Sequence, residues 1–492
     1  DARRGGYTVT TTLDAKLQAA ARKAMRENLE AYDKRHGAQG PFAPPAPVAD
    51  RKGKARPPPR DVPFEGTPRF ESHKIVVGVV VGADDAQGVL DVRVGTVLGS
   101  VRIADFARYN PGKLAASQLA PPGTLLRVSL LAPVPESAVA ERGSAVKAKV
   151  PLRLELGPEG ALVALDVRTR GVLALVGSYE GALGSLDRAL QSRRQPGSTF
   201  KPIVYSYALH ARTYTPATLV DVNPEVFEGG YKPANYEGWT GHDPLRLREA
   251  LAHSVNVAAV RVLRDVGPAN VVAWGESLGI KSTLKPDLSL ALGSYEVQPL
   301  ELAGAYATFA AGGVYDEPRI ITRIVGPNGQ EVPLKPLPPP RRVLEDAEAY
   351  VMTHMLTSVV DHGTAARAKS LRRPVAGKTG TSNASTDTWF AGYSPDIAAV
   401  VWVGYDDGKP LERETGGSLA LPAWIDFMKA AHEGRPPSEF PRPAGVVGAR
   451  IDPHSGKLAA PDAVDAVDEV FLLGTEPTEV SEAPEEHAAA EP

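Results

Sequence analysis

Residues 195–209, QPGSTFKPIVYSYAL, constrain the fold most narrowly because they fix where an apolar helix begins. Proline is tolerated only in the first turn of a helix, so Pro202 places the helix start within a few residues of Ser198. Apolar side chains then recur at the i, i+3, i+4, i+7, i+8 spacing of a helix that buries one face. These side chains are Phe200, Ile203, Val204, Tyr207 and Ala208.

This helix start places a serine three residues ahead of a lysine. Ser198 would keep a free backbone N–H there, which could stabilise an oxyanion formed by attack of its own hydroxyl on a carbonyl. Lys201 lies on the same helix face, so its amine can reach the Ser198 oxygen. A buried, partly cationic site would lower the pKa of that amine and make it a base. We therefore predict that Ser198 is a nucleophile with Lys201 as its base; the alternative is an exposed lysine near a helix cap.

The S-x-x-K pattern alone does not decide between these readings. About one or two matches are expected by chance in a chain of this length and composition, and this one has three. The other two lie at residues 144–147 (SAVK), in a stretch that alternates like a strand, and at 282–285 (STLK), in a predicted loop that holds Pro286. Only Ser198 is followed by a helical apolar stripe.

Composition excludes several functions. The 492 residues carry a net charge of −3, which disfavours a dominant nucleic-acid role although residues 34–60 are locally basic. Cysteine is absent, so there is no thiol nucleophile, disulfide or cysteine-ligated metal. Cysteine usage therefore does not indicate the cellular compartment. No apolar run is long enough to span a bilayer and no signal peptide is visible. The chain opens on DARRGGYTV without a methionine, as a fragment would, so we expect a membrane anchor to be missing.

The pattern of apolar residues predicts several kinds of structure along the chain. A strand is expected at 7–13 and a helix at 14–32, with Asp14 as its N-cap. Short alternating runs between Glu71 and Leu154 predict a small all-β barrel. Strands and helices then mix, with a hairpin at 160–179, several helices between 245 and 311, and two later paired strands, TDTWFAGYSP and IAAVVWVGYDD.

A second motif, Ser254-Val255-Asn256, falls where LREALAHSVNVAAVRVLRDVG breaks between two predicted helices. The break would present a hydroxyl and an amide together on a loop. An asparagine that merely caps the second helix is the alternative.

A third motif, Lys378-Thr379-Gly380-Thr381, leads into the paired strands. A cation and two hydroxyls beside a glycine suit a strand that grips a carboxylate while its backbone comes close to the substrate. An ordinary turn is the alternative.

Together and in this order, the three motifs resemble the signature of penicillin-binding proteins and serine β-lactamases. The likeness extends over about residues 5–474 to bifunctional class A penicillin-binding proteins of the 1A type, without their glycosyltransferase module. It rests on RRQPGSTFKPIVY, LSLALGSYEVQPLELAGAYATFAAGG, GKTGTSN with DTWFAGYSPD, and TGGSLALPAWIDFMKAA. The resemblance implies a mixed α/β (α+β) transpeptidase domain with an inserted OB-like β-barrel. We accordingly expect a linker segment at 1–37, a Pro-rich basic insertion at 38–65, the barrel at 66–152, the transpeptidase domain at 153–440, a C-terminal extension at 441–474 and a disordered acidic tail at 475–492.

The resemblance also implies a role for each site residue. Ser198 would be acylated by the penultimate D-alanine of a peptidoglycan stem peptide, with Lys201 as the base. Ser254, helped by Lys378, would relay the proton to the leaving amine. Asn256 would hold the substrate amide. Thr379, Gly380 and Thr381 would bind the substrate, and the two threonines would contact its terminal carboxylate. The backbone N–H groups of Ser198 and Thr381 would form the oxyanion hole.

The family implies partners and a location as well. An acceptor amine would complete the cross-link, β-lactams would acylate the serine, and no metal or cofactor is expected. The chain would act at the periplasmic face of the inner membrane. The barrel would bind a regulatory protein or glycan rather than nucleic acid.

Rival functions stay open within this family. A class A β-lactamase is disfavoured, since no E-x-x-L-N loop follows Asn256. A D,D-carboxypeptidase differs only in using water as the acceptor. A non-catalytic β-lactam sensor or scaffold is the alternative from another class.

Overall fold

The computed structural model describes residues 5–45, 61–71, 73–139, 148–181, 186–235, 241 and 243–482. Residues 144–147, most of the Pro-rich insertion and the end of the acidic tail lie outside these ranges. The chain divides into two compact units. We call Arg26–Glu159 with Gly404–Lys409 the barrel unit, and Asp1–Met25, Gly160–Val403 and Pro410–Pro492 the larger unit.

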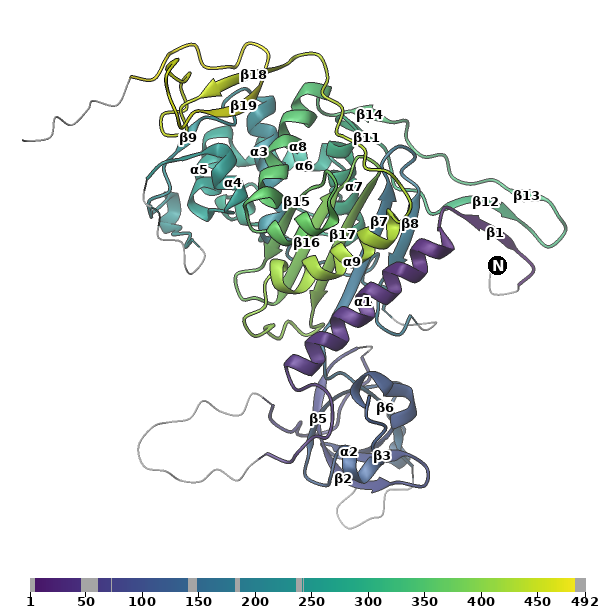
Figure 1. Ribbon diagram of the computed structural model, residues 1–492. Coiled ribbons are helices and arrows are strands. Elements are labelled where there is room, and N and C mark those ends of the chain that lie inside the picture. Colours follow the sequence, from purple (N-terminus) through teal and green to yellow (C-terminus); the bar gives the residue numbers. More distant parts are fainter. Residues whose placement is uncertain are drawn as a thin grey trace, which may run out of the picture. The chain divides into compact units, whose positions relative to one another are not determined.

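The barrel unit is built on a closed five-stranded barrel, which confirms the predicted all-β barrel (Figure 1). Its strands follow the spatial order β2, β3, β4, β6, β5. Alternate side chains point inward, as the period of a strand requires, and form one apolar core. The strands are β2 (Val76–Asp84), β3 (Val89–Val94), β4 (Val97–Arg102), β5 (Leu125–Leu130) and β6 (Val150–Leu154).

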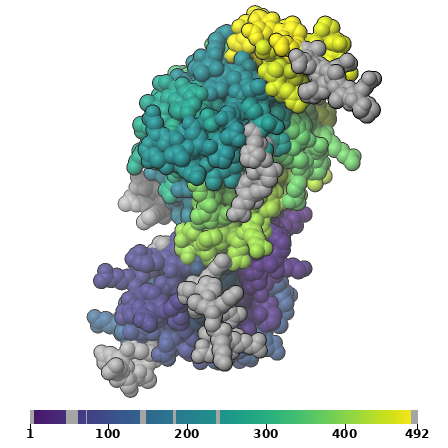
Figure 2. All heavy atoms as spheres, turned by 90° about the vertical axis from the view of Figure 1, so that its left-hand side faces the viewer, coloured from purple at the N-terminus to yellow at the C-terminus, as the bar shows by residue number. Residues whose placement is uncertain are grey.

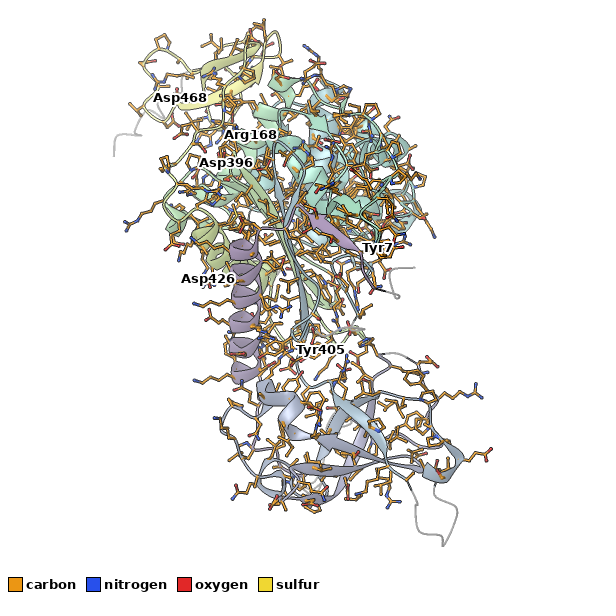
Figure 3. All side chains as sticks on the ribbon, turned by 90° about the vertical axis from the view of Figure 1, so that its right-hand side faces the viewer. Tyr7, Arg168, Asp396, Tyr405, Asp426 and Asp468 are labelled. Atoms are coloured by element: carbon orange, nitrogen blue, oxygen red, sulfur yellow. The ribbon has the colours of Figure 1, made fainter. Side chains whose placement is uncertain are left out.

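The larger unit centres on a five-stranded sheet in the order β15, β16, β17, β7, β8. The predicted hairpin and the later paired strands are therefore confirmed. The strands are β7 (Glu159–Asp166), β8 (Val172–Val176), β15 (Ala376–Thr381), β16 (Asp387–Tyr393) and β17 (Ile397–Gly404). In Figure 3, Arg168 and Asp396 mark two neighbouring turns of this sheet, where their side chains approach to 3.8 Å.

Helices cover both faces of the sheet. Successive side chains of a strand point to opposite faces, so contacts from one strand show what covers each face. Phe390 of β16 packs against Trp424 of α9 (Leu421–Ala431). Tyr393, three residues further along the same strand, packs against Tyr306 of α7 (Pro299–Ala310). The sheet is consequently buried on both sides, and every residue of β16 and β17 is buried.

The helical part of the larger unit surrounds α3 (Lys201–His210). Its helical neighbours are α5 (Asn256–Val266), α6 (Pro268–Ser277) and α8 (Asp346–Asp361), and α4 (Leu247–Ala252) packs against α5 and α8. Pro202 lies in the first turn of α3, as predicted. The predicted apolar face is buried, except that Tyr207 is half-buried. Burial extends beyond this face to eight of the ten residues of α3, because α5, α6 and α8 all pack against it.

Smaller elements complete the chain. Helix α1 (Ala15–Arg35) is capped by Asp14, whose carboxylate accepts the N–H of Leu17 at 2.9 Å, as predicted. The expected N-terminal strand, β1 (Thr8–Thr11), forms a sheet with β12 (Ile321–Val325) and β13 (Glu331–Val332). The remaining short strands are β9 (Leu219–Val220), β10 (Leu245–Arg246), β11 (Val314–Tyr315) and β14 (Arg341–Arg342).

The C-terminal hairpin consists of β18 (Val446–Ile451) and β19 (Val467–Leu472). Residues 475–482, in the segment expected to be disordered, are held instead by backbone hydrogen bonds of Leu458 with Glu479 and Ser481. Within the described part of the chain, no helix combines the length and apolar character needed to cross a membrane.

Candidate active site

The predicted nucleophile lies in a tight turn just ahead of α3. Ser198 belongs to a 3-10 turn, Gly197–Phe200, and is half-buried. Across the described ranges, neither its hydroxyl nor its N–H forms a hydrogen bond. Gly197 adopts a φ of +55°, which favours glycine, and its N–H donates to Gly293 O at 3.3 Å. The turn thus presents a hydroxyl and an N–H that are both free to act on a ligand.

Lys201 is fully buried as the first residue of α3, which excludes the exposed-lysine alternative. Its amine donates to Ser254 O at 2.6 Å and to Asn256 Oδ1 at 2.7 Å, and lies 3.3 Å from Ser254 Oγ. No hydrogen bond joins it to the Ser198 hydroxyl in the described chain. The first and second motifs therefore meet at the lysine rather than at the serine.

Burial changes the charge state of the two motif lysines. It lowers the pKa of Lys201 well below its ordinary value, and the charge of Lys378 lowers it further. Burial also lowers the pKa of Lys378 to about 7. Both shifts favour the neutral form of an amine, which is the form that Lys201 needs to accept a proton.

The Ser254 loop joins α4 to α5. Ser254 adopts a φ of +59°, a strained conformation for a serine. Its N–H and that of Val255 donate to Leu251 O and Ala250 O, which closes the end of α4. The hydroxyl and carbonyl of Ser254 are thereby presented to Lys201.

Asn256 does not cap α5, so the capping alternative is wrong. The cap is Asn235, whose Oδ1 accepts the N–H groups of Asn256 at 3.0 Å and Val257 at 3.1 Å. The Asn256 amide donates to Ala234 O at 2.7 Å, which leaves its oxygen for Lys201. Sequence reasoning missed Asn235, since nothing in its local pattern links it to a helix that begins 21 residues later.

The third motif forms a strand, so the ordinary-turn alternative is also wrong. Lys378, Thr379, Gly380 and Thr381 belong to β15, which pairs only with β16 in its sheet. Lys378 is fully buried and its amine donates to Thr379 O at 3.2 Å. The hydroxyls of Thr379 and Thr364 lie 2.7 Å apart, which adds Thr364 to the site as a residue the sequence did not indicate.

Glycines bring β15 against the turn that holds Ser198. A β-carbon on Gly197 would lie 2.6 Å from Thr381 O and 3.0 Å from Thr381 N. Thr381 Oγ1 also accepts the N–H of Gly416 at 3.1 Å. The backbone of Thr381 therefore lies beside the residue that precedes Ser198.

The competing S-x-x-K segments do not join this arrangement. Ser282 is buried and donates to Glu301 Oε2 at 2.7 Å, while Lys285 is exposed in a loop, as predicted. The segment at 144–147 lies outside the described residues. Among the residues that are described, no group of three or more His, Cys, Asp or Glu side chains could hold a metal ion.

Comparison with known families agrees with this geometry. Residues 160–429 match the penicillin-binding protein transpeptidase domain, and residues 442–486 match the C-terminal domain of penicillin-binding protein 1A. The chain therefore belongs to the penicillin-binding protein transpeptidase family.

Its relatives include proteins of the 1A type. Penicillin-binding protein 1A of Pseudomonas aeruginosa is 32% identical over 97% of this chain and 63% of its own length. Penicillin-binding protein 1A of Aquifex aeolicus is 41% identical over 66% of this chain and 45% of its own length. The chain thus spans less than two thirds of each of these relatives. The crystal structure of penicillin-binding protein 1A from Haemophilus influenzae superposes with a TM-score of 0.69 at 26% identity, covering 98% of this chain and 75% of that one.

Proposed function

We propose that this chain is a serine D,D-transpeptidase that cross-links peptidoglycan stem peptides through an acyl-enzyme on Ser198 and is acylated by β-lactams. The observation that carries the proposal is the environment of Lys201, a buried amine whose pKa is lowered by burial and by Lys378. A neutral amine one helical turn from a free serine hydroxyl is the pairing that nucleophilic catalysis needs.

Acylation starts with proton transfer from Ser198 to Lys201 as the serine oxygen attacks the penultimate D-alanine carbonyl. The backbone N–H groups of Ser198 and Thr381 stabilise the oxyanion. This role is supported by the unpaired N–H of Ser198 and by the closeness of Thr381 to Gly197. One such donor contributes roughly a hundredfold or more to the rate.

The leaving D-alanine needs a proton on its amine. Ser254 passes it from Lys201, helped by the Lys378 charge, and the 3.3 Å separation of Lys201 Nζ from Ser254 Oγ supports this relay. Thr379 and Thr381 bind the terminal carboxylate beside the charge of Lys378, while Asn256 holds the substrate amide. An amine from a neighbouring stem peptide then attacks the acyl-enzyme, which forms the cross-link and frees Ser198.

Two alternatives fit the same site. A D,D-carboxypeptidase would use water in place of the amine, and a β-lactam sensor or scaffold would stop at the acyl-enzyme. From the family to which the chain belongs, we further propose that the protein acts at the periplasmic face of the inner membrane and is held there by an N-terminal anchor. We also propose that the barrel binds a regulatory partner.

Mass spectrometry after treatment with benzylpenicillin tests the proposal. We expect a mass increase equal to one penicillin, located on the peptide that contains Ser198 and absent in Ser198→Ala. Ser282→Ala is the matched control and should be labelled like the wild type. Attachment elsewhere would disprove the assignment. A D-Ala-D-Ala peptide with and without an added acceptor amine then separates the three functions. A cross-linked product indicates a transpeptidase, and hydrolysis alone indicates a carboxypeptidase. If neither product forms, the protein is a sensor or scaffold.

A further inference from the structure

A buried carboxylate connects the C-terminal hairpin to the helices that form the site. Glu469 on β19 is 1% exposed. Its Oε2 accepts from Arg248 Nε at 2.7 Å and from Arg246 Nη1 at 3.3 Å, its Oε1 accepts from Arg248 Nη2, and the N–H of Val470 donates to it at 2.9 Å. These charge-assisted bonds offset the cost of burying the carboxylate.

The Arg248 guanidinium also binds α8. It donates to His354 O at 2.6 Å and to Ser358 Oγ at 2.9 Å, and Arg248 Nη2 lies 2.9 Å from His354 Nδ1. Burial, together with the charge of Arg248, lowers the pKa of His354 to about 4, so the ring is neutral and Nδ1 accepts. One arginine thus joins the hairpin, α4 and α8.

Both helices end at the active site. Helix α4 ends at Ala252, two residues before Ser254, and α8 ends three residues before Thr364. Thr364 N donates to Ala252 O at 3.1 Å, and its hydroxyl meets that of Thr379. Because α4 has only six residues, packing and not its own hydrogen bonds decides where it lies. Figures 1 and 2 both show the yellow C-terminal residues beside the teal helical surface.

We propose that Glu469 is a positioning residue for acylation: through Arg248 it fixes α4 and α8, and so sets Ser254 against Lys201. The inference rests on the proposed function and extends the active-site scaffold to a hairpin outside residues 160–429, which match the transpeptidase domain. In Figure 3, Asp468 marks the place of the neighbouring residue in this hairpin.

A purely structural ion pair would affect stability alone, and the barrel unit supplies the matched control. Asp33 is 0% exposed, and its Oδ2 accepts from the buried Arg108 Nε at 2.5 Å. Asp33→Asn and Glu469→Gln each replace a buried carboxyl that pairs with arginine, and Glu469 is the one whose arginine partner bonds to α8. Both variants should lower the melting temperature.

The test measures the acylation rate constant at saturating benzylpenicillin in proteins that are native by circular dichroism. Glu469→Gln should slow acylation by about tenfold to a hundredfold, as small misplacements of catalytic groups do, while Asp33→Asn stays within twofold of the wild type. A folded Glu469→Gln with the wild-type rate would overturn the inference. An unlabelled wild type would instead overturn the proposed function.

Two milder variants decide the matter if Glu469→Gln does not fold. Glu469→Asp keeps the charge on a shorter side chain, and Ser358→Ala removes one bond between Arg248 and α8. Both should slow acylation several-fold with native circular dichroism. Wild-type rates in both would overturn the positioning role.

Discussion

Gly380 of β15 lies against Pro196, the residue two positions ahead of Ser198. A β-carbon on Gly380 would be 2.4 Å from Pro196 O and 2.8 Å from Thr199 Cγ2. Neither the carbonyl oxygen nor the buried threonine can move away without displacing the turn that holds Ser198. The closeness of this strand to the serine therefore depends on the missing side chain.

Gly380→Ala should separate β15 from the Ser198 turn and slow penicillin acylation by about a hundredfold, the cost of misplacing reacting groups by an ångström. Stopped-flow acylation checks this. Gly112→Ala is the control, since its added β-carbon would have no neighbour nearer than 3.8 Å. Equal rates in wild type and Gly380→Ala would show that the strand does not need this close approach.

The two buried lysines should respond differently to replacement and to pH. Lys201→Arg should be nearly inactive at every pH, because a guanidinium cannot be deprotonated in a protein. In the proposed mechanism Lys378 acts as a cation, and its pKa is lowered to about 7, so subsaturating acylation of the wild type should fall as pH rises through about 7. Lys378→Arg keeps its charge and should show partial activity without this alkaline decline. Rate constants measured from about pH 5.5 to 9 test all three proteins; a wild-type rate that still climbs above neutrality would remove Lys378 from the cationic role.

Asn235→Ala should weaken both the start of α5 and the placement of Asn256. The N–H groups of Asn256 and Val257 lose their acceptor, and loss of a helix cap lowers the free energy of unfolding by about 1 kcal/mol. Acylation should also slow several-fold, because the contact between Lys201 and Asn256 loosens. Urea unfolding and acylation rates measure the two effects. Asn223→Ala, in an exposed turn, is the control. Loss of stability at an unchanged rate would limit Asn235 to capping.

Glu155 of the barrel unit should make stability depend on pH. Burial raises the pKa of its carboxyl from 4.5 to about 7, while Ser129 Oγ donates to it at 2.7 Å. Between these two pKa values the folded state therefore binds more protons than the unfolded state. The protonated carboxyl contributes roughly 3 kcal/mol to the free energy of unfolding; this contribution is full below about pH 4.5 and is lost as pH rises through about 7. Unfolding of wild type and Glu155→Gln at about pH 5 and 8 gives the difference. The same pH dependence in both proteins would contradict the assignment.

The barrel should be dispensable for acylation. All three motifs lie in the larger unit, and inserted domains enter hosts that keep their own core. Residues 66–152 are replaced by a Gly/Ser linker. Asp33→Asn is added because the deletion removes Arg108, the partner of this buried carboxylate. The acylation rate should stay within about threefold of wild type. Circular dichroism and penicillin labelling check the product. A folded protein that is no longer labelled would mean that the barrel shapes the site.

The sequence by itself determined the local features of this protein. Pro202 and the apolar spacing after Ser198 located the start of α3, because both act within one or two helical turns. Alternation predicted the barrel strands and the sheet hairpins, since a strand with one inward face must repeat every two residues. The order of the three motifs indicated the family.

Only the tertiary structure decided which loops meet. The partner of Lys201 lies 53 residues away at Ser254, and Glu469 binds Arg248 across 221 residues. Periodicity indicates that a face is buried but not what covers it, so the burial of α3 beyond its predicted face, the cap at Asn235 and the hairpin carboxylate could not be predicted. Such contacts depend on packing between distant segments, where the free energy of burying a charge is offset only by the particular groups that the fold brings together.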